Sequence, residues 1–171
     1  GRLPILNTGI RVACAKVPPS QHLTGDTTMI EKCIDGWHDY IFRKKPGALE
    51  ELIAEDCVFL SPVVFTPQVG RDITIAYLTA AGGTLGGQGA PGDDMPAENA
   101  GKFKYTKEVL AGNHAVLEFE TEMNGKYVNG VDIITCNDEG KITEFRVMIR
   151  PLQAVNAVHA AMGAMLEKMK G

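Results

Sequence analysis

The sequence of 171 residues has no apolar run long enough to cross a membrane as a helix. It has no block of basic residues either: 17 Lys and Arg stand against 21 Asp and Glu, for a net charge of −4. A mildly acidic chain without a basic cluster argues against nucleic acid or an anionic membrane as the main partner. We therefore expect no nucleic acid and no membrane among its partners.

Cysteine and histidine are scarce, with four of each. The cysteines form no C-x-x-C pair and no two histidines have the spacing H-x-x-x-H, so we expect no metal, and we expect no other cofactor. No serine occurs in a nucleophile-elbow pattern. Widely spaced thiols and the lack of an apolar signal-peptide core in the first residues favour a cytoplasmic protein with reduced cysteines.

The chain length favours one domain. Residues 1–27 have no sustained periodicity, and we interpret them as an N-terminal arm, followed by a single domain over 28–171. Within this domain, the segment 82–101 is rich in glycine and contains two prolines, which predicts a loop. Loops of this length are uncommon in compact domains, so a lid over a pocket is one interpretation of it.

Apolar residues at steps of three and four predict the helices. Thr28 and Glu31 have the spacing of a capping box before the first helix. Pro46 predicts the first residue of a short second helix, and a third helix is expected over about 71–81. A last helix after Pro151 carries a methionine-rich stripe, typical of core packing, which consists of Leu152, Val155, Val158, Met162, Met165, Leu166 and Met169.

Alternating residues predict a short strand at 57–60 and four more strands over 103–110, 114–123, 126–136 and 141–150. Asn124 and Gly125 form a strong signal for a two-residue hairpin turn between two of these strands. Helices followed by an antiparallel sheet predict an α+β domain.

The turns predict which residues share a face of the sheet. The two-residue turn places Leu117 opposite Asp132, and a three-residue loop before it places Tyr105 opposite Phe119. A four-residue turn after it places Phe145 opposite Asp132. One face is then apolar around Asp132 and carries Phe103, Tyr105, Leu117, Phe119, Val128, Ile134, Phe145, Val147 and Ile149.

The opposite face of the sheet is charged. The same register pairs Lys104 with Glu120 and Lys102 with Glu122, and complementary charges across strands support it. An apolar strip lies among these charges and consists of Tyr127, Val131, Ile133 and Met148. The strip is either the interface of a homodimer or the surface that the N-terminal arm covers.

Asp132 is the sharpest functional candidate, because a carboxylate on an apolar face is costly unless it is hydrogen-bonded, neutral or solvated. One interpretation is an acid, base or hydrogen-bond donor in a cavity. The alternatives are a structural aspartate with satisfied hydrogen bonds, or a register error that places it in solvent.

Five segments carry a resemblance to a known family: residues 54–63 (AEDCVFLSPV), 70–73 (GRDI), 130–134 (GVDII), 139–142 (EGKI) and 145–147 (FRV). With these segments the chain resembles the SnoaL-like branch of the nuclear transport factor 2-like superfamily over about residues 28–170. The resemblance implies a curved antiparallel sheet wrapped around helices, forming a cone with an apolar pocket. The superfamily includes ketosteroid isomerases, polyketide cyclases and noncatalytic binding proteins, so the resemblance leaves the function open.

The resemblance to ketosteroid isomerase is partial. Asp132 matches the aspartic acid that this enzyme keeps protonated in an apolar site. Ser61 stands where the enzyme has its catalytic base, and Trp37 falls near its oxyanion-hole tyrosine. For the cyclases, a single pocket acid suffices, and Asp132 can fill that role.

These observations predict a protein that binds a small, mostly apolar ligand in its pocket. Asp132 is the catalytic candidate, and the candidates for ligand contact are Trp37, Tyr40, Ser61, Tyr105, Leu117, Phe119, Ile134, Phe145 and Val147. The first hypothesis is a proton-transfer enzyme of the isomerase or cyclase type, and the alternative is a noncatalytic ligand-binding or dimerisation module. A cavity of about 300 Å³ or more at Asp132 would favour the first hypothesis.

Overall fold

The structure of the chain is a computed structural model that describes residues 27–85 and 102–170. Nearly all of the predicted arm, and the segment 86–101, lie outside the described residues. The described residues form, in chain order, α1 (Met29–Ile41), α2 (Ala48–Leu52), β1 (Ile53–Leu60), β2 (Gln68–Val69), α3 (Arg71–Leu85), β3 (Lys104–Ala111), β4 (His114–Met123), β5 (Lys126–Cys136), β6 (Ile142–Arg150) and α4 (Leu152–Lys170).

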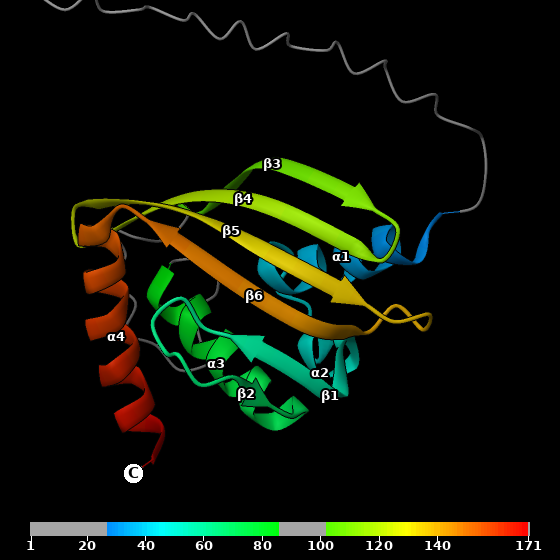
Figure 1. Ribbon diagram of the computed structural model, residues 1–171, viewed down its shortest axis with the longest axis horizontal. Helices are drawn as coiled ribbons and strands as arrows, with labels where there is room; N and C mark the ends of the chain where they lie inside the picture. The colour runs from blue at the N-terminus through cyan, green and yellow to red at the C-terminus, as the bar shows by residue number, and fades with distance from the viewer. Residues whose placement is uncertain (1–26, 86–101, 171) are drawn as a thin grey trace, which may run out of the picture.

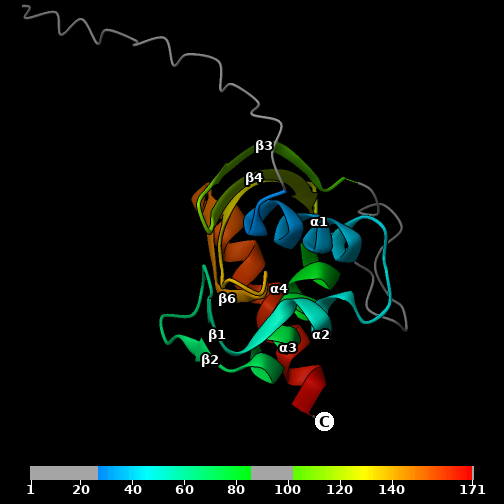
Figure 2. The ribbon, with the colours of Figure 1, turned by 90° about the vertical axis from the view of Figure 1, so that its right-hand side faces the viewer.

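The strands form a sheet of six strands in the order β2-β1-β6-β5-β4-β3, which is not closed into a barrel (Figure 1). Figure 2 shows this sheet arching over α1. The predicted α+β class, with a curved sheet around helices, is confirmed. The sheet is mixed, because β1 runs parallel to β6 while the other neighbouring strands are antiparallel. No helix of the described residues is long and apolar enough to cross a membrane.

The predicted start of the first helix is confirmed. The Thr28 hydroxyl accepts a hydrogen bond from the backbone N–H of Glu31, and the Glu31 carboxylate accepts one from the backbone N–H of Thr28 at 2.7 Å. These reciprocal bonds satisfy donors that a helix start leaves free. The apolar face of α1 is buried from Ile30 to Ile41, so the helix fills the concave side of the sheet.

Two predicted helix boundaries are wrong, and the strand predicted at 57–60 begins earlier, at Ile53. The second helix begins at Ala48 rather than Pro46, because Gly47 before it adopts a left-handed backbone conformation with φ of 76°. The third helix continues through Leu85, so the first four residues of the predicted glycine-rich loop are helical. Tertiary contacts hold this last turn: the Thr121 hydroxyl donates to the Leu85 carbonyl at 2.8 Å.

The predicted stripe of α4 is wrong at its start. Leu152 is 69% exposed, whereas Ala154, Val158 and Met162 are buried. These three residues follow at steps of four and therefore lie on one face of α4. This face packs against α3 and the end of the sheet. The side chains of the predicted residues Met165, Leu166 and Met169 lie outside the described part of the structure.

The predicted register between β4 and β5 is confirmed, including Leu117 opposite Asp132. Tyr105 lies opposite Phe119, also as predicted, although the connecting loop is shorter than expected. Ala111 pairs directly with His114, and a bulge between Tyr105 and Lys107 supplies the residue that the shorter loop omits.

The predicted register between β5 and β6 is wrong by two residues. Val147 lies opposite Asp132, and Phe145 lies opposite Ile134. The connecting turn has one residue more than expected, since Cys136 pairs with Ile142, and a bulge next to this pair adds another. A shift of two preserves the face of every side chain, so Phe145 and Val147 still lie on the concave side.

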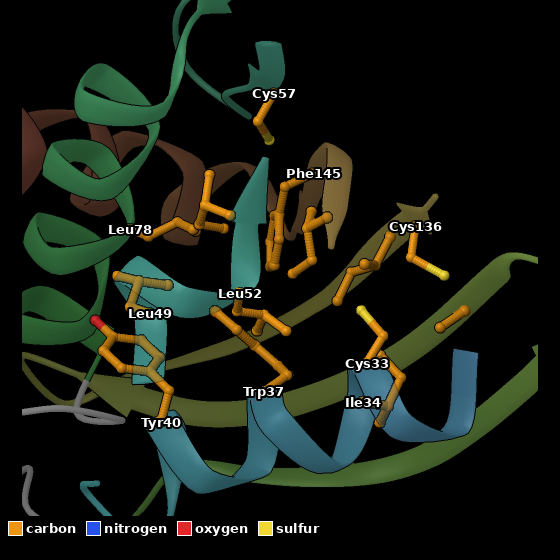
Figure 3. Packing of buried hydrophobic residues seen from close by; sticks show 14 of the residues in the cluster. Cys33, Ile34, Trp37, Tyr40, Leu49, Leu52, Cys57, Leu78, Cys136 and Phe145 are labelled. Carbon is orange, nitrogen blue, oxygen red and sulfur yellow. The ribbon is translucent and has the colours of Figure 1, made fainter. Parts of the chain in front are cut away.

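The core lies between the concave face of the sheet and the helices, and Figure 3 shows α1 side chains pointing toward Phe145 and Leu52. Three cysteines are free and buried here, and burial together with Cys136 raises the pKa of the Cys33 thiol to about 12. These thiols therefore stay protonated and act as small apolar side chains.

Candidate functional site

A cavity lies on the concave side of the sheet, between β3–β6 and the helices α1, α3 and α4. Its volume is about 60 Å³, measured as the space open to the centre of a water molecule. A buried water needs ~10–15 Å³ on this measure, so the cavity has room for roughly four to six waters. Its wall consists of Trp37, Ile41, Phe59, Ser61, Pro62, Leu78, Ala81, Gly82, Leu85, Phe103, Tyr105, Phe119, Asp132, Phe145, Val147, Ile149, Val158 and Met162.

The cavity wall is mostly apolar and contains many aromatic rings. The Trp37 ring lies 4.8 Å from that of Phe145, and the rings of Phe103 and Phe119 stack at 5.2 Å. Tyr105 contacts Phe103 edge to face, at 5.2 Å between ring centroids. Contacts of this kind hold the rings in fixed positions, so the described wall is preformed around its few polar groups.

Asp132 is the only carboxylic acid among the wall residues, and its side chain is 5% exposed. Its Oδ2 accepts a hydrogen bond of 2.6 Å from the Tyr105 hydroxyl. Burial raises the pKa of Asp132 from 3.8 to about 7, and the Tyr105 hydrogen bond opposes this rise in part. The carboxyl therefore exchanges its proton near neutral pH.

Trp37 completes a chain of hydrogen bonds that ends at Asp132. Its indole Nε1–H donates to the Tyr105 oxygen at 2.8 Å, and Tyr105 donates in turn to Asp132. Burial, with the Asp132 carboxylate as a second cause, raises the pKa of Tyr105 well above its usual value. Tyr105 therefore remains protonated and acts as a hydrogen-bond donor.

Ser61 lies at the end of β1, where its hydroxyl accepts hydrogen bonds from the backbone N–H groups of Val63 and Val64 at 3.2 and 3.3 Å. This turn brings the serine to the cavity wall. A serine hydroxyl is not a base at neutral pH, so Asp132 is the only group of the described wall that takes up a proton there.

Many solved structures have the fold of this chain. No protein-family model and no curated protein matches its sequence. A steroid delta-isomerase from Pseudomonas aeruginosa is 25% identical, with a TM-score of 0.71 over 84% of this chain and 95% of its own. An uncharacterized protein with a cystatin-like fold from Silicibacter pomeroyi is 27% identical, with a TM-score of 0.64 over 77% and 83%. A protein of unknown function from Mesorhizobium loti, described as NTF2-like, is 23% identical, with a TM-score of 0.58 over 75% and 98%. The chain has the fold of the nuclear transport factor 2-like superfamily.

The predicted superfamily is therefore confirmed. Similar structures include both a named isomerase and proteins of unknown function. The fold therefore does not determine the activity, which depends on the residues of the site.

The structure brings together most of the residues predicted for the site. Those on the cavity wall are Trp37, Ser61, Tyr105, Phe119, Asp132, Phe145 and Val147. Tyr40, Leu117 and Ile134 are not on the wall, and they lie in the core cluster around α1. Leu117 and Ile134 have no exposed surface, because α1 covers this part of the sheet and fills the space.

The prediction missed the helical half of the cavity wall. α3 contributes Ala81, Gly82 and Leu85, and α4 contributes Val158 and Met162. Predicting a sheet face does not reveal which helices lie opposite it. The small residues at 80–83 were the available signal, since small side chains on a helix leave space against a neighbouring element.

No group of three or more His, Cys, Asp or Glu residues in the described ranges could hold a metal ion. His38 on α1 is half-buried and lies 2.9 Å from the Glu108 carboxylate. Its ring centroid is 6.0 Å from that of Tyr105. His38 and Glu108 are thus neighbours of the hydrogen-bond chain that ends at Asp132.

Proposed function

We propose that this protein belongs to the SnoaL-like branch, binds a small, mostly apolar molecule in its cavity, and transfers a proton to or from it through Asp132. One observation carries the proposal: a buried carboxyl whose pKa is raised to about 7 lies on the wall of an apolar cavity. An acid with a pKa near the working pH is suited to general acid–base catalysis.

The chemistry of the wall favours a one-group mechanism. When protonated, Asp132 can donate a hydrogen bond to a carbonyl oxygen of the ligand, and when ionised it can remove a proton. Ser61 offers no second base, so the same carboxyl takes up the proton and returns it. A cyclisation or isomerisation assisted by one acid fits this arrangement better than the two-acid mechanism of ketosteroid isomerase.

The cavity size supports a second candidate, a noncatalytic binding or dimerisation module. The volume of about 60 Å³ lies well below the roughly 300 Å³ that marks the low end for ligand sites. The described wall therefore admits a ligand of few heavy atoms and leaves no room for a four-ring steroid. We accordingly propose a small ligand for either function.

A screen of small ketones, lactones and aromatic acids by thermal shift tests the proposed function. A ligand at one hundred times its dissociation constant stabilises the fold by about 2.7 kcal/mol. With such a ligand, Asp132→Asn is expected to lower the rate of any proton transfer by roughly 10²- to 10⁴-fold. Ala81→Phe should abolish binding by filling the cavity.

Ile73→Phe is the matched control, because Ile73 lies on the same helix, is exposed and is absent from the cavity wall. It should leave both binding and turnover unchanged. Binding that survives Ala81→Phe would contradict the cavity as the site. Binding that Asp132→Asn leaves intact, with no turnover in either protein, would support the noncatalytic module.

We also propose that the protein is a homodimer in the cytoplasm. The apolar strip predicted on the outer face of the sheet includes Tyr127 and Met148, which are 51% and 52% exposed. No helix of the described ranges packs on this face, and ion pairs such as Lys104–Glu120 flank the strip. An apolar strip with a charged border suits a two-fold interface, in which the same patch meets itself.

Met148→Lys tests the dimer by placing a charge at the centre of the strip. Light scattering at micromolar concentration should give the dimer mass for the wild type and the monomer mass for this variant. Glu139→Lys, at the tip of the β5–β6 turn, is the control and should remain dimeric. A monomeric wild type would contradict the proposal.

A further inference from the structure

We infer that Trp37 and Tyr105 are positioning residues, which keep the exchangeable proton of Asp132 on Oδ1 by holding a donor against Oδ2. This inference rests on the proposed role of Asp132 as the proton-transfer group. It adds two residues that touch no reacting atom and that act through Asp132, and it assigns the exchange to one of its two oxygens.

The direction of the hydrogen bonds follows from the groups themselves. An indole N–H can only donate, so the Trp37 bond of 2.8 Å occupies an acceptor position on the Tyr105 oxygen. Tyr105 has one hydroxyl proton, and it cannot point toward Trp37. The bond of 2.6 Å therefore directs that proton to Asp132 Oδ2.

This direction decides where Asp132 carries its own proton. A proton on Oδ2 would meet the Tyr105 proton in the same short contact, and would force the tyrosine hydroxyl to turn toward the apolar wall. Leaving that donor unpaired in a buried place is costly. Oδ1 is thus the oxygen that gains and loses the proton and that is left for a ligand.

The position of Trp37 is itself well fixed, as this role requires. Its side chain is buried on α1, between the rings of Tyr40 at 5.4 Å and Phe145 at 4.8 Å. Tyr105 lies on β3 and Asp132 on β5. The three groups come from separate elements, so the packing of α1 against the sheet determines the hydrogen-bond geometry.

Few other titratable groups lie near the hydrogen bonds that join Trp37, Tyr105 and Asp132. Tyr105 and Asp132 are the only titratable residues on the described cavity wall. Next to Tyr105, the His38–Glu108 pair joins α1 to β3, and the Glu108 charge contributes to the raised pKa of Tyr105. A variant of His38 is therefore the control for this pair.

The chain has one tryptophan, so the indole ¹H–¹⁵N signal in an NMR spectrum reports on Trp37 alone. Ionisation of Asp132 strengthens its bond from Tyr105, which polarises the Tyr105 oxygen and strengthens the bond from Trp37. We expect the indole proton to move downfield as pH rises, with the same midpoint as the ¹³C signal of the Asp132 carboxyl.

Three variants test whether the ionisation of Asp132 reaches the Trp37 indole through the hydrogen bonds of Tyr105 or whether the indole signal responds to pH in general. In Asp132→Asn, the indole titration should disappear. In Tyr105→Phe, the indole should no longer follow the carboxyl, and the Asp132 midpoint should rise by about one to two pH units, a change of roughly 10- to 100-fold in proton affinity. His38→Gln should leave the indole midpoint unchanged.

An indole signal that does not share the Asp132 midpoint in the wild type would overturn the inference, whatever the variants do. An indole that still follows the carboxyl in Tyr105→Phe would also overturn it, because the effect would then pass through space. These titrations use no ligand. Failure of the proposed function would appear instead as turnover that Asp132→Asn leaves unchanged, or as ligand binding without turnover in either protein, so the two failures are distinguishable.

Discussion

Asp132→Asn is expected to stabilise the fold at pH 8 by up to about 4 kcal/mol and to leave its stability almost unchanged at pH 4. The Asp132 pKa rises from 3.8 to about 7 on folding, a difference of about three units. Each unit corresponds to ~1.36 kcal/mol. Asparagine keeps an oxygen for the Tyr105 hydroxyl and carries no charge at any of these pH values.

The direction in which stability changes with pH depends on whether the folded or the unfolded state binds the Asp132 proton more tightly. Between about pH 4 and pH 7 the folded state keeps the proton and the unfolded state has lost it, so the stability of the wild type falls as pH rises. Above the folded pKa both states are ionised, and the loss is complete. The difference between variant and wild type should therefore grow from pH 4 to pH 7 and then stay constant.

Urea unfolding of both proteins from pH 4 to pH 8 measures this difference, in which the contributions of other groups largely cancel. Asp56→Asn is the control for changing an exposed aspartate, since Asp56 lies on the surface of β1, and a shift within about 0.5 kcal/mol is expected. A variant that is less stable than the wild type at pH 8 would show that Asp132 is a structural acid.

An acid such as Asp132, whose burial lowers the stability of the fold at neutral pH, is not explained by a structural role. Structural aspartates accept several hydrogen bonds and raise stability, whereas the hydrogen bond from Tyr105 does not offset the burial of Asp132. Stability given up at a cavity wall is typical of functional sites, where activity requires a strained or poorly solvated group. The pH profile of stability therefore bears directly on the proposed function, even before a ligand is known.

Asp132 could be placed from the sequence because a single turn determines its position in the sheet. Asn124 and Gly125 are suited to the positive φ angles of a two-residue turn, and both have positive φ in the structure. That turn determines the register of β4 and β5 and therefore the face on which Asp132 lies. The turn after β5 has no such signature, and its longer form with an adjacent bulge moved the β6 register by two residues.

The rest of the site depends on packing between distant elements, which local patterns do not encode. Trp37 and Tyr105 were both predicted to contact the ligand, but their hydrogen bond depends on how α1 crosses the sheet. The α3 and α4 walls depend likewise on helix placement. The missed half of the cavity is thus the part that tertiary structure alone determines.

Gly130→Ala is expected to destabilise the fold by about 3 kcal/mol, at the upper end for overpacking of a core. A Cβ atom at Gly130 would overlap the Phe119 ring and lie 2.8 Å from the backbone oxygen of Met148. The ring could turn aside, but the Met148 oxygen belongs to the neighbouring strand and cannot move without distorting the sheet. Glycine at this position of β5 thus allows Phe119 to lie across the strand.

Gly163→Ala is the matched control, because a Cβ atom there meets nothing within 4 Å. In the exposed middle of α4, this change should stabilise the fold by ~0.5–1 kcal/mol. Urea unfolding measures both variants. Phe119 stacks on Phe103, which contacts Tyr105, so a displaced Phe119 ring should also disturb the donor to Asp132. If Gly130→Ala were as stable as the wild type, Phe119 would not lie over Gly130, and this part of the cavity wall would be misplaced.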